Sequence, residues 1–171
     1  MIRAIIVALV FASGVARADT APPEVEASLG QPVLQGATDF EFLGFDLFDA
    51  SLWTDGTGYS DARPFALSLT YARRFTAEQL TRQTIRELAR IEGSNTRSLA
   101  ALASLEACFA DVGRGDRITA VRLSSDGIRF FVNGRVSCDY QDAGFANRFF
   151  SIWLGDETRD PRRRDRLLGV G

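Results

Sequence analysis

The sequence contains neither lysine nor histidine, so all of its 20 basic residues are arginines. The absence of histidine excludes a Ser-His-Asp triad and a histidine-ligated metal centre, because both need an imidazole. The absence of lysine excludes a Schiff-base enzyme and a nucleotide-binding P-loop. Composition therefore says more about what this protein is not than about what it does.

The N-terminal residues have the pattern of an export signal. Arg3 supplies a positive start, residues 4–15 are mostly apolar, and residues 16–18 (Ala-Arg-Ala) have the form of a cleavage site. The apolar run is shorter than the roughly 20 residues that a membrane span needs. We predict a signal peptide at residues 1–18 and a mature protein that is periplasmic or secreted. The alternatives are an N-terminal anchor and a buried helix.

Removing 18 of the 171 residues leaves 153, which suits one domain, residues 19–171. The signal holds two arginines and no acid, so 18 basic and 22 acidic residues remain, a net charge of −4. A chain of this sign has no overall attraction to nucleic acid or to anionic membranes. We predict no nucleic-acid partner, no stable membrane insertion, no metal and no cofactor.

Cysteine is scarce, since only Cys108 and Cys138 are present. Two cysteines without histidine are too few for a structural zinc site, which takes four ligands. Export would allow them to form a disulfide, which would stabilise the fold by roughly 3–4 kcal/mol in the chain-entropy treatment. The alternative, two separate buried thiols, stays open.

Hydrophobic alternation and turn residues predict antiparallel strands. Residues 40–53 are apolar on both faces, which is typical of one strand, or two with a bend, covered on both sides. Residues 65–71 alternate between large apolar side chains and Ala, Ser or Thr, as in a strand with one polar or small-residue face. Two hairpin signals of the Asp-Gly and Asn-Gly type predict a meander over residues 117–123, 128–132 and 135–140.

Helix signals fall between and after these strands. Thr76 and Gln79 fit a capping box and start a helix that Gly93 ends. A second helix is predicted to follow, and Asp142 is predicted to cap a third. The second would turn five apolar side chains inward: Leu99, Leu102, Leu105, Phe109 and Val112. Residues 19–31, which include two prolines, are predicted as strand or loop.

Four arginines, at positions 162–164 and 166, lie in a short helix predicted to begin at Asp160-Pro161 and end before Gly169. We expect these arginines to face water or to pair with Asp156, Glu157 and Asp165, whereas Phe149, Ile152 and Trp153 of the preceding helix should be buried. A nucleic-acid surface would need a wider basic patch with stacking aromatics. The order of elements predicts an α+β fold.

Five segments carry a resemblance to a known family: "FLGFDLFDASLW" (42–53), "GRGDRITAV" (113–121), "FFVNG" (130–134), "FANRFFSIWLG" (145–155) and "RRDRLLG" (163–169). In this order they resemble the bacterial chalcone isomerase-like proteins, over residues 34–169. The resemblance implies an open-faced β-sandwich, a large antiparallel sheet with helices packed on one face. This agrees with the α+β order.

Chalcone isomerases of plants close a flavanone ring with the help of an arginine beside the oxyanion and of a threonine and a tyrosine that share a water. The resemblance places the arginine within residues 36–40, the threonine near Leu43 and the tyrosine near Gly93, where the sequence has no such residues. Fold alone does not give activity. We therefore expect no catalysis of the plant type.

Five residues are candidates for contact with a small apolar or amphipathic ligand: Asp46, Phe48, Tyr71, Arg73 and Trp153. Asp46 shares the parity of apolar neighbours, so it either lines a pocket or is turned to solvent by a bulge or paired with an arginine. Tyr71 and Trp153 either line a cleft or belong to the core.

Three functions follow as hypotheses. The first is a non-catalytic protein that binds a fatty-acid-like molecule in a cleft between sheet and helices. The second is an isomerase or intramolecular lyase with a site unlike the plant one, for which a polar cluster including Arg73 or Arg135 would speak. The third is an accessory protein that binds an envelope partner through an exposed apolar patch.

Overall fold

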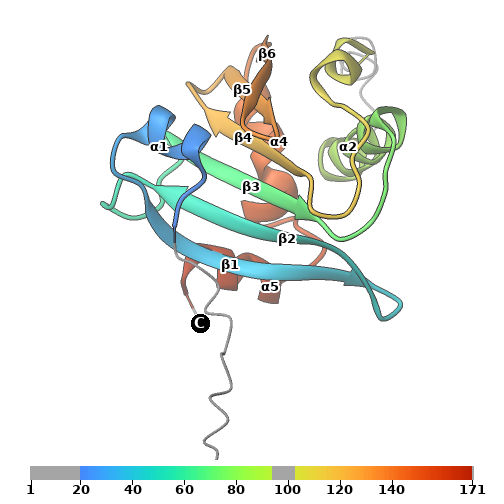
Figure 1. Cartoon of the computed structure of the whole chain (residues 1–171), viewed down its shortest axis with the longest axis horizontal. Coiled ribbons are helices and arrows are strands. Elements are labelled where there is room, and N and C mark those ends of the chain that lie inside the picture. The colour runs from blue at the N-terminus through green and yellow to red at the C-terminus, as the bar shows by residue number, and fades with distance from the viewer. Residues whose placement is uncertain (1–19, 94–102, 171) are drawn as a thin grey trace, which may run out of the picture.

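One antiparallel sheet of six strands organises the protein (Figure 1). The computed structural model describes residues 20–93 and 103–170, so the predicted signal peptide, Leu99 and Leu102 lie outside the described residues. Strands that follow one another in the sequence are neighbours in the sheet. They are β1 (Val33–Phe42), β2 (Phe45–Thr54), β3 (Phe65–Tyr71), β4 (Arg117–Arg122), β5 (Gly127–Val132) and β6 (Arg135–Gln141).

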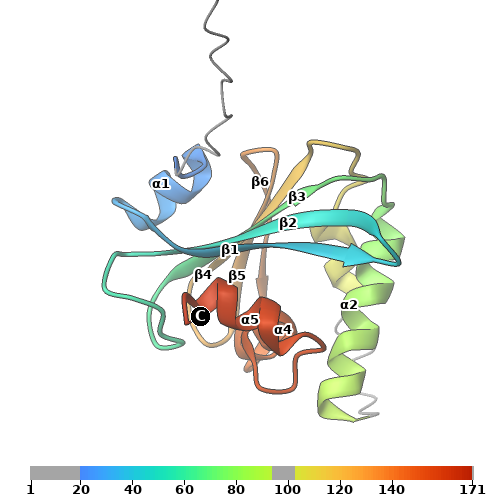
Figure 2. The ribbon, with the colours of Figure 1, turned by 90° about the horizontal axis from the view of Figure 1, so that it is seen from below.

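Helices cover one face of this sheet, which confirms the predicted open-faced α+β fold. In Figure 2, α2 (Ala77–Glu92), α4 (Phe145–Leu154) and α5 (Pro161–Leu168) lie on one side of the strands, and α1 (Pro23–Leu29) lies on the other. The alternation of β3 explains the division, because Phe65, Leu67, Leu69 and Tyr71 join the main core under the helices, whereas Ala66 packs with α1 on the far face. No helix within the described residues is long and apolar enough to cross a membrane.

The prediction of a strand or loop over residues 19–31 was wrong, because α1 forms there. Pro23 is tolerated at the first turn of the helix, where its missing N–H has no partner to lose. The Glu24 carboxylate of α1 is buried and accepts hydrogen bonds from Arg117 at 2.7 and 3.0 Å and from the Thr119 hydroxyl at 2.8 Å. These contacts hold α1 to β4.

The second predicted helix also differs from the structure. A short 3-10 helix, η1, spans Ala103–Cys108, and the chain beyond it is extended, with Val112 in a β-bridge to Phe75. Of the two alternatives for the cysteines, the structure has the disulfide, with 5.1 Å between the Cα atoms of Cys108 and Cys138. The bridge fastens η1 to β6.

The caps predicted from the sequence are present in α5 but not in α4. Asp160 caps α5 by accepting from the Arg163 amide, and Gly169 ends it in the left-handed conformation, as predicted. Asp142 does not cap α4, which begins after Gly144.

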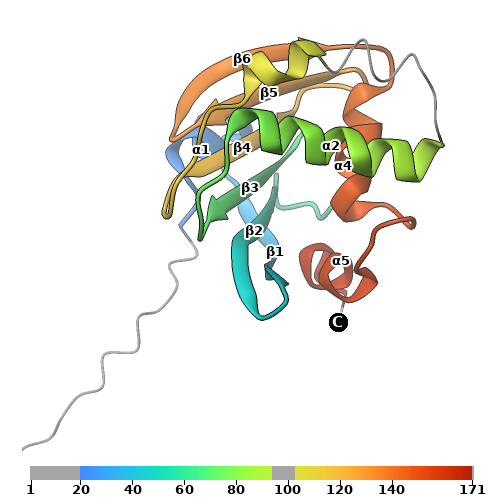
Figure 3. The same cartoon turned by 90° about the vertical axis from the view of Figure 1, so that its right-hand side faces the viewer.

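α5 packs against β1 so closely that Gly36 has no room for a side chain. A Cβ atom at this position would lie 2.0 Å from the Arg166 carbonyl oxygen and 2.5 Å from that of Leu167. Gln35 adds a hydrogen bond of 2.7 Å to the Leu168 carbonyl, and the Leu167 side chain is fully buried. The helix therefore lies against β1 and next to α4 (Figure 3).

Candidate functional site

A cleft of about 820 Å³ lies between the helix-covered face of the sheet and the helices. Its strand side is almost entirely apolar, and its helical side adds apolar groups from α2, α4 and the segments between. The strands contribute Phe40, Phe42, Leu47, Phe48, Leu67, Leu69, Tyr71, Ile118 and Ala120. The rest of the apolar lining is Phe75, Leu80, Phe109, Phe149, Ile152 and Trp153. Such a volume and lining are typical of sites for small apolar molecules.

Three of the five candidate residues, Phe48, Tyr71 and Trp153, meet in this cleft. Phe48 stacks on Phe40, with 4.8 Å between ring centroids, and lies 5.8 Å from the ring of Tyr71. Tyr71 contacts Phe75 in turn at 5.7 Å. These rings form a continuous aromatic wall at the end of the cleft where β2 begins.

The Tyr71 side chain is buried in the cleft wall, but its hydroxyl oxygen is not fully enclosed. Tyr71 is 5% exposed, and no described residue forms a hydrogen bond with its hydroxyl. Burial raises the pKa of Tyr71 far above its usual value, so the group stays protonated and can donate. Because Tyr71 lines the cleft, a ligand atom there could accept the hydrogen bond of this hydroxyl.

Trp153 packs against the main core but, against the prediction, is not fully buried. It is only half-buried, as is Ile152, whereas Phe149 is buried as expected. The Trp153 ring lies 5.2 Å from that of Phe149 and borders the cleft. The other tryptophan, Trp53, lies on the opposite face of the sheet with α1 and cannot reach this site.

Asp46 and Arg73 do not line the cleft. The register of β1 and β2 shifts between Phe40 and Glu41, which leaves Leu47 as an extra residue in β2. This bulge reverses the in-and-out alternation of side chains from which Asp46 was predicted to line a pocket. The Asp46 carboxylate is turned to solvent, which is the alternative that the sequence left open. Arg73 is exposed, with its guanidinium 5.2 Å from the centre of the Phe45 ring.

A buried carboxylate in the cleft wall escaped the sequence analysis. Glu87 of α2 accepts hydrogen bonds from Gln83 at 2.9 Å, from Arg90 at 2.9 Å and from Arg159 at 2.7 Å. Two guanidinium groups thus balance one buried charge, which offsets its desolvation. A sequence signal existed, because Glu87 lies seven residues after Leu80 and so falls within the apolar face of the helix.

Arg163 is also part of the cleft, against the prediction that it faces water or pairs with Asp156, Glu157 or Asp165. Its side chain is 22% exposed and pairs with Asp160 at 2.5 Å. It also donates to the Asp39 carbonyl oxygen and lies 5.5 Å from the centre of the Phe40 ring. Hydrogen bonds from Arg163 outweigh the effect of burial and lower the pKa of Asp160. Arg164 is half-buried and pairs with Asp156 and Asp165, two of the predicted partners. Arg162 is exposed, as predicted.

The outer rim of the cleft is polar and carries an arginine available to a ligand. α2 contributes Gln79, Arg82, Gln83 and Arg86 to this rim. Arg82 is paired with Glu78 at 2.8 Å. In the described part of the chain, Arg86 has no carboxylate within ion-pair distance.

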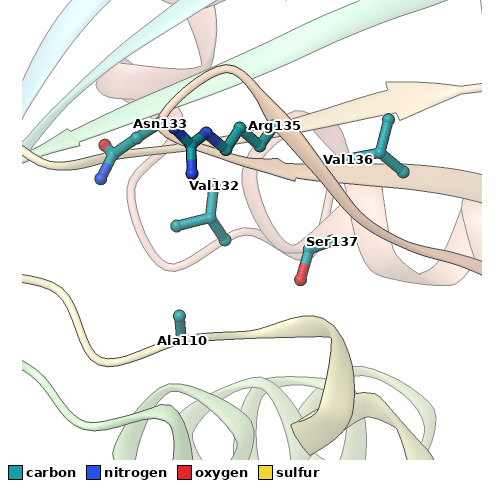
Figure 4. A pocket seen from close by; sticks show the side chains of 6 residues that line it. All are labelled: Ala110, Val132, Asn133, Arg135, Val136 and Ser137. Carbon is teal, nitrogen blue, oxygen red and sulfur yellow. The ribbon is translucent and has the colours of Figure 1, made fainter.

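A smaller recess of about 480 Å³ lies between β6 and the segment after η1 (Figure 4). Val132 and Ser137 point across it toward Ala110, and the Arg135 side chain lies beside Asn133 at the β5–β6 turn. Most of its lining is exposed, and neither Arg73 nor Arg135 reaches the cleft. Within the described residues, no cluster of acidic or cysteine side chains could hold a metal ion.

Comparison with known proteins gives the same architecture. A solved structure, that of a fatty-acid-binding protein of Arabidopsis thaliana, superposes with a TM-score of 0.62 over 87% of this chain and 95% of its own, at 14% sequence identity. Identity this low shows the fold alone. No curated protein matches the sequence. A profile of the chalcone isomerase-like family matches residues 43–169, about three quarters of the chain, and the protein therefore belongs to that family.

Proposed function

We propose that this protein binds a small amphipathic molecule with a long apolar chain, such as a fatty acid, in the cleft between sheet and helices, without transforming it. The observation that carries the proposal is the cleft itself, whose walls are mostly apolar. Among the described residues, its charged groups lie at the rim or in ion pairs, and the hydroxyls of Thr84 and Thr158 donate to backbone carbonyls. The printed name of the superposed plant protein, a fatty-acid-binding protein, supports the same class of ligand.

The apolar chain of the ligand would lie on the floor formed by β3 and β4. Leu67, Leu69 and Ala120 project from these strands and face side chains from α2 and α4 across the cleft. Each methylene group moved from water into such a site is favourable by about 0.8 kcal/mol. Chain length should therefore govern affinity more than any single polar contact does.

The polar end of the ligand would lie at the rim, beside Arg86. A carboxylate placed deep in the cleft at Tyr71 would lose its hydration without gaining a cation, which is costly. Arg86 is exposed and has no ion-pair partner among the described residues, so it offers charge without that cost. The Tyr71 hydroxyl suits a neutral polar atom within the chain, such as a hydroxyl or keto oxygen.

Two features support the absence of catalysis and the export of the protein. Of the three acids that line the cleft, Glu87 and Asp160 are held by arginines, so neither is free to act as a general base, and the third, Glu41, is exposed at the end of β1. A disulfide between Cys108 and Cys138 suits an oxidising compartment, as the predicted signal peptide requires.

A pair of arginine variants tests the site. Displacement of a fluorescent fatty-acid analogue would be measured for dodecanoate and for dodecanol. Arg86→Gln should weaken dodecanoate roughly fivefold, as expected for about 1 kcal/mol of charge interaction, and leave dodecanol unchanged. Arg82→Gln is the matched control, because Arg82 lies one turn away and already pairs with Glu78. Equal effects of both variants, or no displacement by either ligand, would refute the assignment.

A further inference from the structure

The hairpin between β1 and β2 ends in three exposed apolar side chains. Phe42 is 64% exposed, Leu43 80% and Phe45 60%. Leu43 is the first residue of a two-residue turn, and Phe42 and Phe45 flank this turn as a pair across the strands. The hairpin projects beyond the rest of the sheet (Figure 1). We call residues 42–45 the apolar tip. A cluster of this kind on a protein surface marks an interaction site.

Leu43 is not the type of residue that the conformation of this turn favours. Leu43 and Gly44 have φ angles of +51° and +75°, and Asn133 and Gly134 of the β5–β6 hairpin have +49° and +81°. The two turns have the same length and both central residues at positive φ, for which Asn-Gly is favoured. The β5–β6 hairpin has that sequence. At the apolar tip, a leucine occupies a strained conformation and also exposes its side chain to water.

The apolar tip is continuous with the cleft. Phe42 belongs to both, since its side chain lines the cleft at the end where β1 meets β2. The next residue, Leu43, lies outside the cleft lining. An apolar molecule that leaves the cleft at this end passes directly along the exposed side chains of the tip.

We propose that the apolar tip inserts into the surface of a lipid bilayer, where the cleft takes up or delivers its ligand. Taking each side chain as about 200 Å², the tip exposes about 400 Å² in all. This is about half of what one partner contributes to a standard protein–protein interface, so a second copy of the chain or a folded partner gains too little here. A bilayer accepts a narrow apolar wedge, because lipids adapt to its shape. The proposal rests on the proposed function only for the identity of the cargo.

The charged residues around the tip balance one another, so the tip has no preference for an anionic or a cationic membrane surface. Arg73, over the ring of Phe45, and the adjacent Arg74 have no ion pair within residues 20–93 and 103–170. Glu41 and Asp46 face each other across the strands directly behind the tip. Because two cations and two anions flank the tip, insertion of the apolar side chains should dominate, and binding should persist at raised salt.

Flotation with vesicles tests this proposal. Wild-type protein should float with phosphatidylcholine vesicles and with vesicles that also contain phosphatidylglycerol. Leu43→Asn should lower the vesicle partition coefficient about tenfold or more, the factor that corresponds to burial of one leucine side chain. The same variant should raise the melting temperature, because asparagine accepts a positive φ, so loss of folding cannot explain the result. Leu123→Asn is the control, at an exposed leucine just after β4, at the opposite end of the sheet.

The outcomes separate the two proposals. Loss of vesicle binding in Leu43→Asn, with unchanged displacement of the fluorescent analogue in solution, supports the apolar tip as the membrane contact. Vesicle binding that is absent in the wild type, or equal in Leu43→Asn and the wild type, overturns it. A dimer in light scattering that Leu43→Asn abolishes would also overturn it, in favour of a second copy as the occupant. Failure of analogue binding in every variant would refute the proposed function and leave the vesicle result to stand alone.

Discussion

Gly36→Ala is expected to dislodge α5, because the position has no space for a methyl group. The added Cβ would lie 2.0 Å from the Arg166 carbonyl oxygen and 2.5 Å from that of Leu167, and backbone atoms cannot move aside as a flexible side chain can. Insertion of a methyl group into a close-packed contact costs about 1–3 kcal/mol. Moving the helix also exposes part of Leu167, whose complete burial is worth about 1.5–3 kcal/mol.

We therefore expect the free energy of unfolding to fall by about 3 kcal/mol, a large share of the 5–15 kcal/mol typical of a domain. Urea denaturation followed by circular dichroism measures this directly, and with a slope of about 2 kcal/mol per M the midpoint should fall by about 1.5 M. Gly113→Ala is the control, since its nearest neighbour would be 3.6 Å from the new Cβ, and it should change stability by less than about 1 kcal/mol. Equal stability of Gly36→Ala and the wild type would refute the close seating of α5 on β1.

Three further predictions concern ionic and covalent contacts. Burial raises the pKa of Glu24, but the hydrogen bonds and charge of Arg117 and the Thr119 hydroxyl outweigh it and hold the pKa below the usual 4.5. This carboxylate therefore stabilises the fold above that pH, and the stabilisation is lost as the pH falls through the folded pKa. Glu24→Gln should accordingly cost about 1.5–3 kcal/mol at neutral pH and show a smaller loss of stability on acidification than the wild type; parallel pH dependences would contradict this. Reduction of Cys108–Cys138, which closes a separation of 30 residues, should lower stability by roughly 3–4 kcal/mol, measured by urea melts with and without dithiothreitol, and unchanged melts would count against the bridge. Arg163→Ala should lower the free energy of unfolding by about 1.5–3 kcal/mol, because it removes charge-assisted hydrogen bonds to Asp160 and Asp39. Arg162→Ala, at an exposed position, should lower it by less than about 0.5 kcal/mol. Thermal melts that rank the two variants the other way would refute the account of α5.

Elements that depend on neighbouring residues could be predicted from the sequence. The capping box of Thr76 and Gln79 forms in the structure, Asn133-Gly134 makes its hairpin, and Asp160 caps α5. In each case the interaction that decides the conformation lies within four residues, so the local sequence contains the necessary information.

Features that depend on distant residues could not be predicted in this way. α1 is held by Glu24 through contacts to Arg117, 93 residues away, and its prolines alone favoured a loop. The bulge at Leu47 depends on the register of two strands, which the parity of a single strand does not reveal. Glu87 could have been noticed on the apolar face of α2, but its partner Arg159 lies 72 residues further on in a segment without any pattern.

The central claim, that the cleft binds the apolar chain of an amphipathic ligand, is tested most directly by calorimetric titration with a homologous series of carboxylates from octanoate to palmitate. If the chain lies between the sheet and the helices, the dissociation constant should fall about fourfold per methylene, which corresponds to about 0.8 kcal/mol, until the cleft is full. The heat capacity change of binding should be negative, and Ala120→Phe, which fills the apolar floor, should end the series at a shorter chain. A dissociation constant that does not depend on chain length, or that is the same in Ala120→Phe and the wild type, would contradict binding in this cleft.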